Sequence, residues 1–178
     1  MTEQIKKISP SFWVLTLMVF VAAFVRLLPH PPNFAPIAAM ALFGGAYFNK
    51  KSHALVIPLA AMFLTDAIIG FYSSAWLTYL SFALIVVLGI VMLKKVSVKK
   101  LILASITASV SFFVITNFGV WALGTLYPKT PAGLLESYIA AIPFFQNSLL
   151  GDLFFVGVMF GVYELIKHNV PVLHKVKA

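Results

Sequence analysis

The sequence predicts an all-α membrane protein, a bundle of six transmembrane helices that forms a single integral domain over residues 1–178. Apolar residues make up 61% of the 178 positions and charged residues only 10%, whereas about a quarter of a soluble domain is charged. The apolar residues run in six stretches, and one crossing needs about 20 such residues. The basic residues fall between these stretches in an alternating pattern.

The expected helices follow one another with short connections. They cover residues 12–28, 34–48, 54–72, 76–93, 101–123 and 148–166. Pro10 precedes the first, where a missing amide donor does no harm. The second is the shortest and follows the proline-rich loop at 29–33. Between the fifth and the sixth, prolines bracket an apolar segment that is too short to cross, so residues 127–147 predict an interfacial or re-entrant helix.

The basic residues predict the orientation, because Lys and Arg accumulate in cytoplasmic connections. Most of them lie before the first stretch or after the second, fourth and sixth: Lys6, Lys7, Lys50, Lys51, Lys94, Lys95, Lys99, Lys100, Lys167, Lys175 and Lys177. The other side has only Arg26 and Lys129. This alternation predicts a multi-pass protein with both termini in the cytoplasm. It also accounts for most of the net charge of +8, so the lipid bilayer is an expected partner and nucleic acid is not.

Four polar residues inside the stretches fall at a similar depth. With this topology and a rise of about 1.5 Å per residue, Arg26, Asp66, Asn117 and Asp152 all lie in the outer leaflet. Ionisable groups at such depth normally face a bundle interior or a wet cavity and pair with one another. Arg26 is therefore expected to pair with Asp66 or Asp152, or else to reach the outer headgroups. A pocket open to the outside is the simplest interpretation.

Further polar and aromatic residues are expected near the mouth of this pocket. They are His30, Asn33, Tyr72, Tyr79, Trp121 and Asn147. Aromatic rings beside a few polar groups suit a flat organic ligand, although such rings are also typical of an interfacial belt. The two carboxylates outnumber the one guanidinium, which favours a neutral or cationic ligand.

Two of these polar residues have a purely structural alternative. Asp152 follows a predicted helix N-cap at Asn147 or Ser148 by about one turn, where a carboxylate complements the helix dipole. Asn117 can link two helices by a hydrogen bond.

Small residues four positions apart indicate close helix packing. Ala41 with Gly45, and Gly157 with Gly161, form such pairs, which let two helix backbones approach closely. The partner helix is either internal or part of another protein.

The chain lacks the motifs of the common catalytic and cofactor sites. It has no cysteine, which excludes thiolate catalysis and Cys-ligated zinc, and it has no GxxxxGK[ST], HExxH or GxSxG motif. An enzyme, a metal site and a cofactor are therefore not expected, and any ATP drive has to come from a partner. A catalytic pair of Asp66 and Asp152 is disfavoured because Arg26 at the same level favours two ionised carboxylates.

Four segments carry a family resemblance: RLLPHPPNFAPIAAMALFGGAYF (26–48), TDAIIGF (65–71), YPKTPAGLL (127–135) and NSLLGDLF (147–154). They resemble a bacterial membrane protein family of unknown function that is catalogued among putative transport proteins. That family is distantly similar to the S components of energy-coupling-factor transporters. These six-helix proteins capture vitamins or related micronutrients and associate with a shared ATPase module. The resemblance implies a bacterial inner-membrane protein whose binding residues lie on outer loops and outer helix ends, where Arg26, His30, Asn33, Asp66, Asn117 and Asp152 fall.

The sequence departs from the S components at the docking motif. Many of them carry an AxxxA pattern on the first helix, whereas here Ala22 and Ala23 are followed four positions on by Arg26 and Leu27. The sequence therefore leaves two alternatives: the protein works with an ATPase energising module, or it is a carrier that works alone. The sequence predicts a membrane-embedded subunit that binds and translocates a small organic micronutrient. A self-sufficient carrier or channel, or an accessory structural membrane protein, is the alternative.

Overall fold

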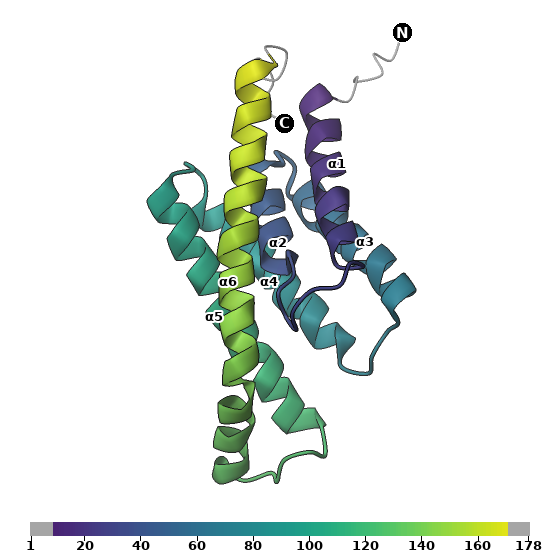
Figure 1. Ribbon diagram of the computed structural model, residues 1–178, viewed down its shortest axis with the longest axis vertical. Helices are drawn as coiled ribbons and strands as arrows, with labels where there is room; N and C mark the ends of the chain where they lie inside the picture. Colours follow the sequence, from purple (N-terminus) through teal and green to yellow (C-terminus); the bar gives the residue numbers. More distant parts are fainter. Residues whose placement is uncertain (1–8, 171–178) are drawn as a thin grey trace, which may run out of the picture.

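The computed structural model describes residues 9–170, and all regular structure in that range is helical (Figure 1). The helices are α1 (Pro10–Val25), α2 (Ile37–Tyr47), α3 (Lys51–Ile69), α4 (Ala75–Met92), α5 (Val98–Leu123) and α6 (Pro131–Asn169). By length and composition, α3, α4, α5 and α6 can cross a membrane, while α1 and α2 are shorter apolar helices. The expectation of an all-helical, membrane-type protein is confirmed.

The connections between helices lie at different levels of the molecule. The start of α1, the end of α6, and the α2–α3 and α4–α5 connections share one end (Figure 1). The α1–α2 and α3–α4 connections lie partway along, and the α5–α6 connection lies at the far end. The described lysine-rich connections thus share one end. That this end is cytoplasmic, and that all six helices cross, stay predictions; the terminal residues Lys6, Lys7, Lys175 and Lys177 lie outside the described residues.

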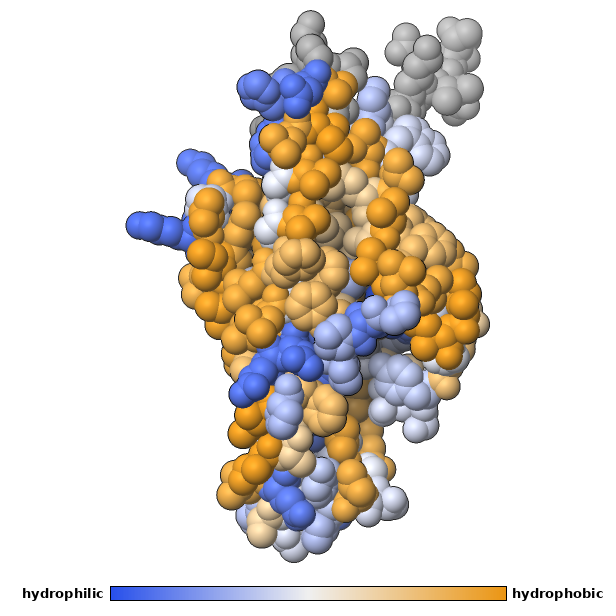
Figure 2. All heavy atoms as spheres, viewed as in Figure 1, coloured by the Kyte–Doolittle hydropathy of each residue, from blue (hydrophilic) through white to orange (hydrophobic). Residues whose placement is uncertain are grey.

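Much of the outer surface is apolar. Large hydrophobic side chains are exposed along the outward faces, among them Leu17 on α1, Ile68 on α3 and Leu103 on α5. Figure 2 shows this as a mostly hydrophobic face, with hydrophilic groups at the upper end and in a patch partway down. An apolar surface of this extent marks an interaction site or contact with lipid, and lipid is the surrounding that suits helices of this composition.

The short helix α2 is the centre of the bundle. It contacts all five other helices, and residues 38–45 are buried without interruption. A helix that is hydrophobic all round is expected in such a place. Gly45 permits a close approach to α4, because a Cβ there would come within 2.4 Å of the Val86 carbonyl oxygen. Ala41, one turn earlier, is fully buried.

Residues 127–147 do not form a separate interfacial or re-entrant helix, so that prediction is wrong. From Pro131 they belong to α6, a continuous helix of 39 residues that contains Pro143. A proline removes one backbone hydrogen bond and often kinks a helix, but neighbouring helices compensate for this in membrane proteins. At about 1.5 Å per residue, α6 is about 58 Å long, against about 30 Å for the hydrocarbon core. The α5–α6 hairpin therefore extends beyond the other connections.

The start of α6 also differs from the expectation. Thr130 is its N-cap and accepts a hydrogen bond from the Gly133 amide at 3.2 Å. Asn147 and Ser148 lie inside the helix, so neither of them caps it. Asp152 is about six turns from the first residue, Pro131, which overturns the explanation of Asp152 by the helix dipole, since that effect is confined to the first turn.

Side-chain bonds to backbone carbonyls hold the hairpin together. Trp121 Nε1 donates to the Pro128 carbonyl at 2.8 Å. The Lys129 ammonium donates to the Trp121 carbonyl near the end of α5, and the Tyr138 hydroxyl donates to the Val114 carbonyl at 2.8 Å. Trp121 therefore has a structural role in the hairpin.

Candidate functional site

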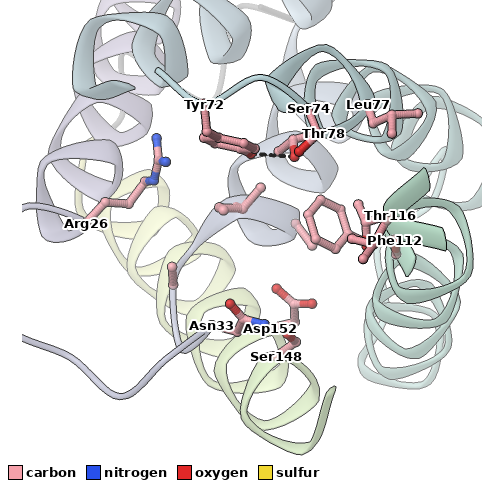
Figure 3. A pocket seen from close by; sticks show the side chains of 14 residues that line it. Arg26, Asn33, Tyr72, Ser74, Leu77, Thr78, Phe112, Thr116, Ser148 and Asp152 are labelled. Carbon is pink, nitrogen blue, oxygen red and sulfur yellow. Dashed lines mark hydrogen bonds between the residues drawn. The ribbon is translucent and has the colours of Figure 1, made fainter. Parts of the chain in front are cut away.

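A cavity of about 250 Å³ lies where α2, α4, α5 and α6 meet the end of α1 and two connections (Figure 3). Its lining residues are Arg26, Asn33, Ala35, Ile37, Ala38, Tyr72, Ser74, Leu77, Thr78, Phe112, Thr116, Val120, Ser148 and Asp152. Pockets for drug-sized ligands usually span about 300–1,000 Å³. The cavity therefore fits a somewhat smaller molecule.

The rim of the cavity comes from the two lysine-poor connections. Asn33 lies in the α1–α2 connection and has a left-handed backbone with φ of 63°, a conformation that Asn tolerates better than most residues. Tyr72 and Ser74 lie in the α3–α4 connection, and the Tyr72 hydroxyl donates to Thr78 Oγ1 at 2.5 Å. The cavity thus lies at the level that the sequence predicts for the outer side.

The proline-rich loop is held against α6, which places Asn33 in the wall. The side-chain amide of Asn147 donates to the Pro32 carbonyl at 3.0 Å. The ring of Phe34 packs against Phe155, with ring centroids 5.5 Å apart. Asn147 therefore positions the loop and does not itself line the cavity.

Arg26 and Asp66 form a buried ion pair beside the cavity. Arg26 Nη2 lies 2.5 Å from Asp66 Oδ1, and the side chains are only 11% and 2% exposed. Arg26 Nη1 donates to Thr65 Oγ1 at 2.5 Å and to the Met62 carbonyl at 3.4 Å. The Tyr79 hydroxyl donates to the other Asp66 oxygen at 2.8 Å. Of the two predicted partners of Arg26, the structure has Asp66, and the network links α1, α3 and α4.

Asp152 is the second buried carboxylate at this level, and its surroundings are different. It is 5% exposed, and Ser109 Oγ donates to its Oδ2 at 2.6 Å. Within residues 9–170, no Lys, Arg or His lies at ion-pair distance from it. Figure 3 shows its carboxylate pointing into the cavity. Burial of a charge is costly unless the charge is paired, so this group is a strong candidate for contact with a ligand.

The α5 residues that line the cavity were not predicted, whereas the two predicted α5 residues, Asn117 and Trp121, do not line it. Phe112 and Thr116 line the cavity, and Ser109 supports Asp152; their spacing places all three on one helix face. One turn before Ser109, Ser105 is fully buried, and its Oγ has no hydrogen-bond partner among the described residues. The sequence shows this stripe of hydroxyl groups, but the same pattern is typical of Ser and Thr that bond to their own helix backbone.

The predicted ligand-binding residues divide into three groups. Arg26, Asn33, Tyr72 and Asp152 line the cavity. Asp66 and Tyr79 lie behind Arg26 and are joined to it through the ion pair. The remaining residues are His30, Asn117, Trp121 and Asn147, which do not line this cavity.

Two of these remaining residues have partners of their own. His30 is exposed, and its Nδ1 lies 2.6 Å from the Leu28 carbonyl. The Asn117 side chain donates to the Phe113 carbonyl at 2.8 Å and lines a smaller neighbouring cavity of about 120 Å³. A ligand role for either would require a ligand larger than the main cavity.

Gly157 and Gly161 lie away from the cavity. A Cβ added at either position meets no atom within 4 Å among the described residues. Both glycines line an open groove of about 670 Å³ between the start of α5 and the end of α6, beside Glu164. Their packing against a partner helix stays a prediction. Although the groove is larger, it is the weaker candidate for a ligand because it holds no buried charge.

The described residues contain no group of three or more His, Cys, Asp and Glu side chains that could hold a metal ion.

The chain belongs to a family of unknown function, DUF6580, whose model matches residues 6–173. No curated protein and no solved structure matches the chain. These comparisons do not link the chain to the S components of energy-coupling-factor transporters.

Proposed function

We propose that this DUF6580 protein is a membrane-embedded subunit that binds a small organic micronutrient and delivers it across the membrane. One observation carries the proposal: the buried carboxylate of Asp152 points into a cavity of small-molecule size within an apolar helical bundle. Ionisable groups inside membrane helices are costly and usually functional. Asp152 has no ion-pair partner in the described chain that would explain it structurally.

The wall of the cavity suits an organic ligand better than a hydrated ion. Apolar groups such as Ile37, Leu77 and Val120 lie beside a few polar ones, Thr116 and Ser148 among them. Ligand sites generally combine a mostly apolar wall with a small number of placed polar groups that fix orientation.

The arrangement favours a binding subunit over an open channel. Between the cavity and the lysine-rich end lies α2, where Met40, Leu42 and Phe43 are fully buried. Such packing of the described residues disfavours an open water path, so we expect release inward to involve a conformational change. The rim faces the end with few lysines, which is the outside if the positive-inside rule holds.

The energy for release of the ligand into the cell could come from an ATPase module or from the protein acting alone. These 178 residues contain no GxxxxGK[ST] motif, so ATP would be bound elsewhere, as it is by the ATPase module of the S components that the sequence resembles. Purified protein in liposomes distinguishes the two arrangements. Uptake without any added module identifies a self-sufficient carrier, and uptake that needs a module identifies an S-like subunit.

Thermal unfolding of the purified protein in detergent tests the proposed binding. A panel of vitamins and corrinoids is compared on wild type, Asp152→Asn and Ser148→Leu, with Glu164→Gln as a control carboxylate outside the cavity. A ligand at 100 times its Kd stabilises the folded state by about 2.7 kcal/mol. Stabilisation by one compound that is lost in both cavity variants and kept in the control supports the proposal. If no compound stabilises wild type, an accessory structural role is favoured instead.

A further inference from the structure

We infer that the cavity selects a small organic cation, an amine or amidine whose positive group pairs with Asp152 while its flat body lies against Phe112 and Tyr72. This inference rests on the proposed function and names the substrate class of the same site. It follows from how the charges around the cavity are already engaged.

The Arg26 guanidinium already has a charged partner before a ligand arrives. It holds Asp66 at 2.5 Å and also donates to Thr65 and Met62, and Tyr79 occupies the other Asp66 oxygen. The pair is therefore neutral as a unit. An anionic ligand would bring a negative charge without a counter-charge, because Asp66 already balances Arg26 and Asp152 adds a second carboxyl group at the cavity. A buried charge without a partner is costly.

Asp152 is the carboxyl group at the cavity that has no charged partner among the described residues. The hydrogen bond that its side chain accepts comes from the Ser109 hydroxyl at 2.6 Å, which is a neutral donor. A carboxylate offers about four lone-pair sites, so acceptor capacity is left for a charged donor. A ligand ammonium or amidinium would supply the compensating charge that residues 9–170 do not provide.

The walls of the cavity indicate what accompanies the positive group. Phe112 and Thr116 stand on the α5 side, and Tyr72 lies across the cavity from Asp152 (Figure 3). Aromatic faces attract cations and stack on flat rings. An inorganic cation fits less well, because such ions take several oxygen ligands and no group of metal-binding side chains gathers among the described residues. The geometry thus favours a compact organic cation with a planar part.

A matched series of small probes tests the charge preference directly. Phenethylamine, phenethyl alcohol and phenylacetate share a ring and a short chain, and at pH 7 they are cationic, neutral and anionic. Each is added at about 10 mM, because fragments of this size bind weakly, and the shift in apparent Tm is measured in detergent. The proteins are wild type, Asp152→Asn, and Glu164→Gln as the control.

We expect only phenethylamine to raise the Tm of wild type and of the control. In Asp152→Asn its affinity should fall at least about tenfold, because a buried charge pair is lost. Ser148→Lys provides a second variant. It places an ammonium one helical turn from Asp152, so it should also abolish the shift, and it leaves the carboxylate in place if Asp152→Asn does not fold.

The outcomes separate this inference from the proposed function. An amine shift that persists in both variants overturns the role of Asp152. A larger shift with the alcohol or with phenylacetate overturns the inference that the ligand is a cation, but it still supports a ligand site in the cavity. Stabilisation by a panel compound that bears no positive charge has the same meaning. If neither the probes nor any panel compound stabilises wild type, both the inference and the proposed function fail.

Discussion

The same substitution at two buried carboxyl groups of one level should have very different consequences for stability. Asp66→Asn removes the charge that neutralises Arg26 at 2.5 Å. Asp152→Asn replaces a carboxyl group that has no ion-pair partner among the described residues. We therefore expect the free energy of unfolding to fall strongly in the first variant and to change little in the second.

The magnitudes follow from burial and from the bonds that survive. The Arg26 side chain is only 11% exposed, and removal of one partner of a buried pair costs about 3–5 kcal/mol. In Asp66→Asn the new carboxamide oxygen can still accept from Tyr79, so we expect a loss of about 3 kcal/mol, at the lower limit of that range. At position 152, the oxygen of the new carboxamide can still accept the hydrogen bond from Ser109. The carboxamide is also neutral, so it avoids the cost of burying a charge without a partner. The expected change there is within about 1 kcal/mol of zero.

Equilibrium unfolding in mixed detergent micelles measures both values. The cycle is completed with Arg26→Gln and the Arg26→Gln/Asp66→Asn double variant. Because the two side chains are in contact, the double variant should be more stable than the sum of the single effects predicts, by about 1–3 kcal/mol. Additive single effects, or a larger loss for Asp152→Asn than for Asp66→Asn, would refute the assignment of Arg26 to Asp66.

Three further predictions concern packing, capping and topology. Gly45→Ala should lower the free energy of unfolding by about 1–3 kcal/mol, because the added methyl group overpacks against α4. Gly157→Ala should be neutral or slightly stabilising, because Gly157 has open space around it. Equal losses in the two variants would contradict this packing. Thr130→Ala should cost about 1 kcal/mol by loss of the α6 N-cap, and unchanged thermal stability would show that the cap contributes little. The chain has no cysteine, so single cysteines report sidedness: a maleimide that cannot cross the membrane should label Ser73→Cys on intact cells and Val96→Cys only after lysis, and the reverse pattern would invert the topology.

The positions of several helices could be predicted because each depends on a local run of residues. The apolar stretch 76–93 became α4 over Ala75–Met92, and the stretch 101–123 became the greater part of α5. Apolar length and polar ends suffice for such an assignment, because a membrane helix satisfies its own backbone hydrogen bonds.

The prediction for residues 127–147 was wrong because it relied on prolines, whose local effect on the chain is overridden here by tertiary contacts. Phe113 on α5 stacks on Phe145 with ring centroids 4.7 Å apart, and Tyr138 bonds to the α5 backbone. These contacts hold the chain helical on both sides of Pro143. Neither of them is visible in the sequence around the proline.

The central position of α2 in the bundle could not be predicted from the sequence either. Its residues read as uniformly apolar, as a lipid-facing helix would. Lipid tails and a protein core are about equally apolar, so hydrophobicity does not separate a helix in the centre from one at the edge. Only the contacts of α2 with all five other helices place it there.

The sequence by itself determined that the protein is helical, apolar and of membrane type, and it placed Arg26, Asp66 and Asp152 at a similar level of the bundle. That level follows from position along a helix, which the sequence records. Tertiary structure decided that Arg26 pairs with Asp66 and that Asp152 faces the cavity beside Phe112 and Thr116. The reason is physical: pairing depends on how each helix is rotated about its axis and on which neighbours it packs against, and both are set by contacts between residues far apart in the chain.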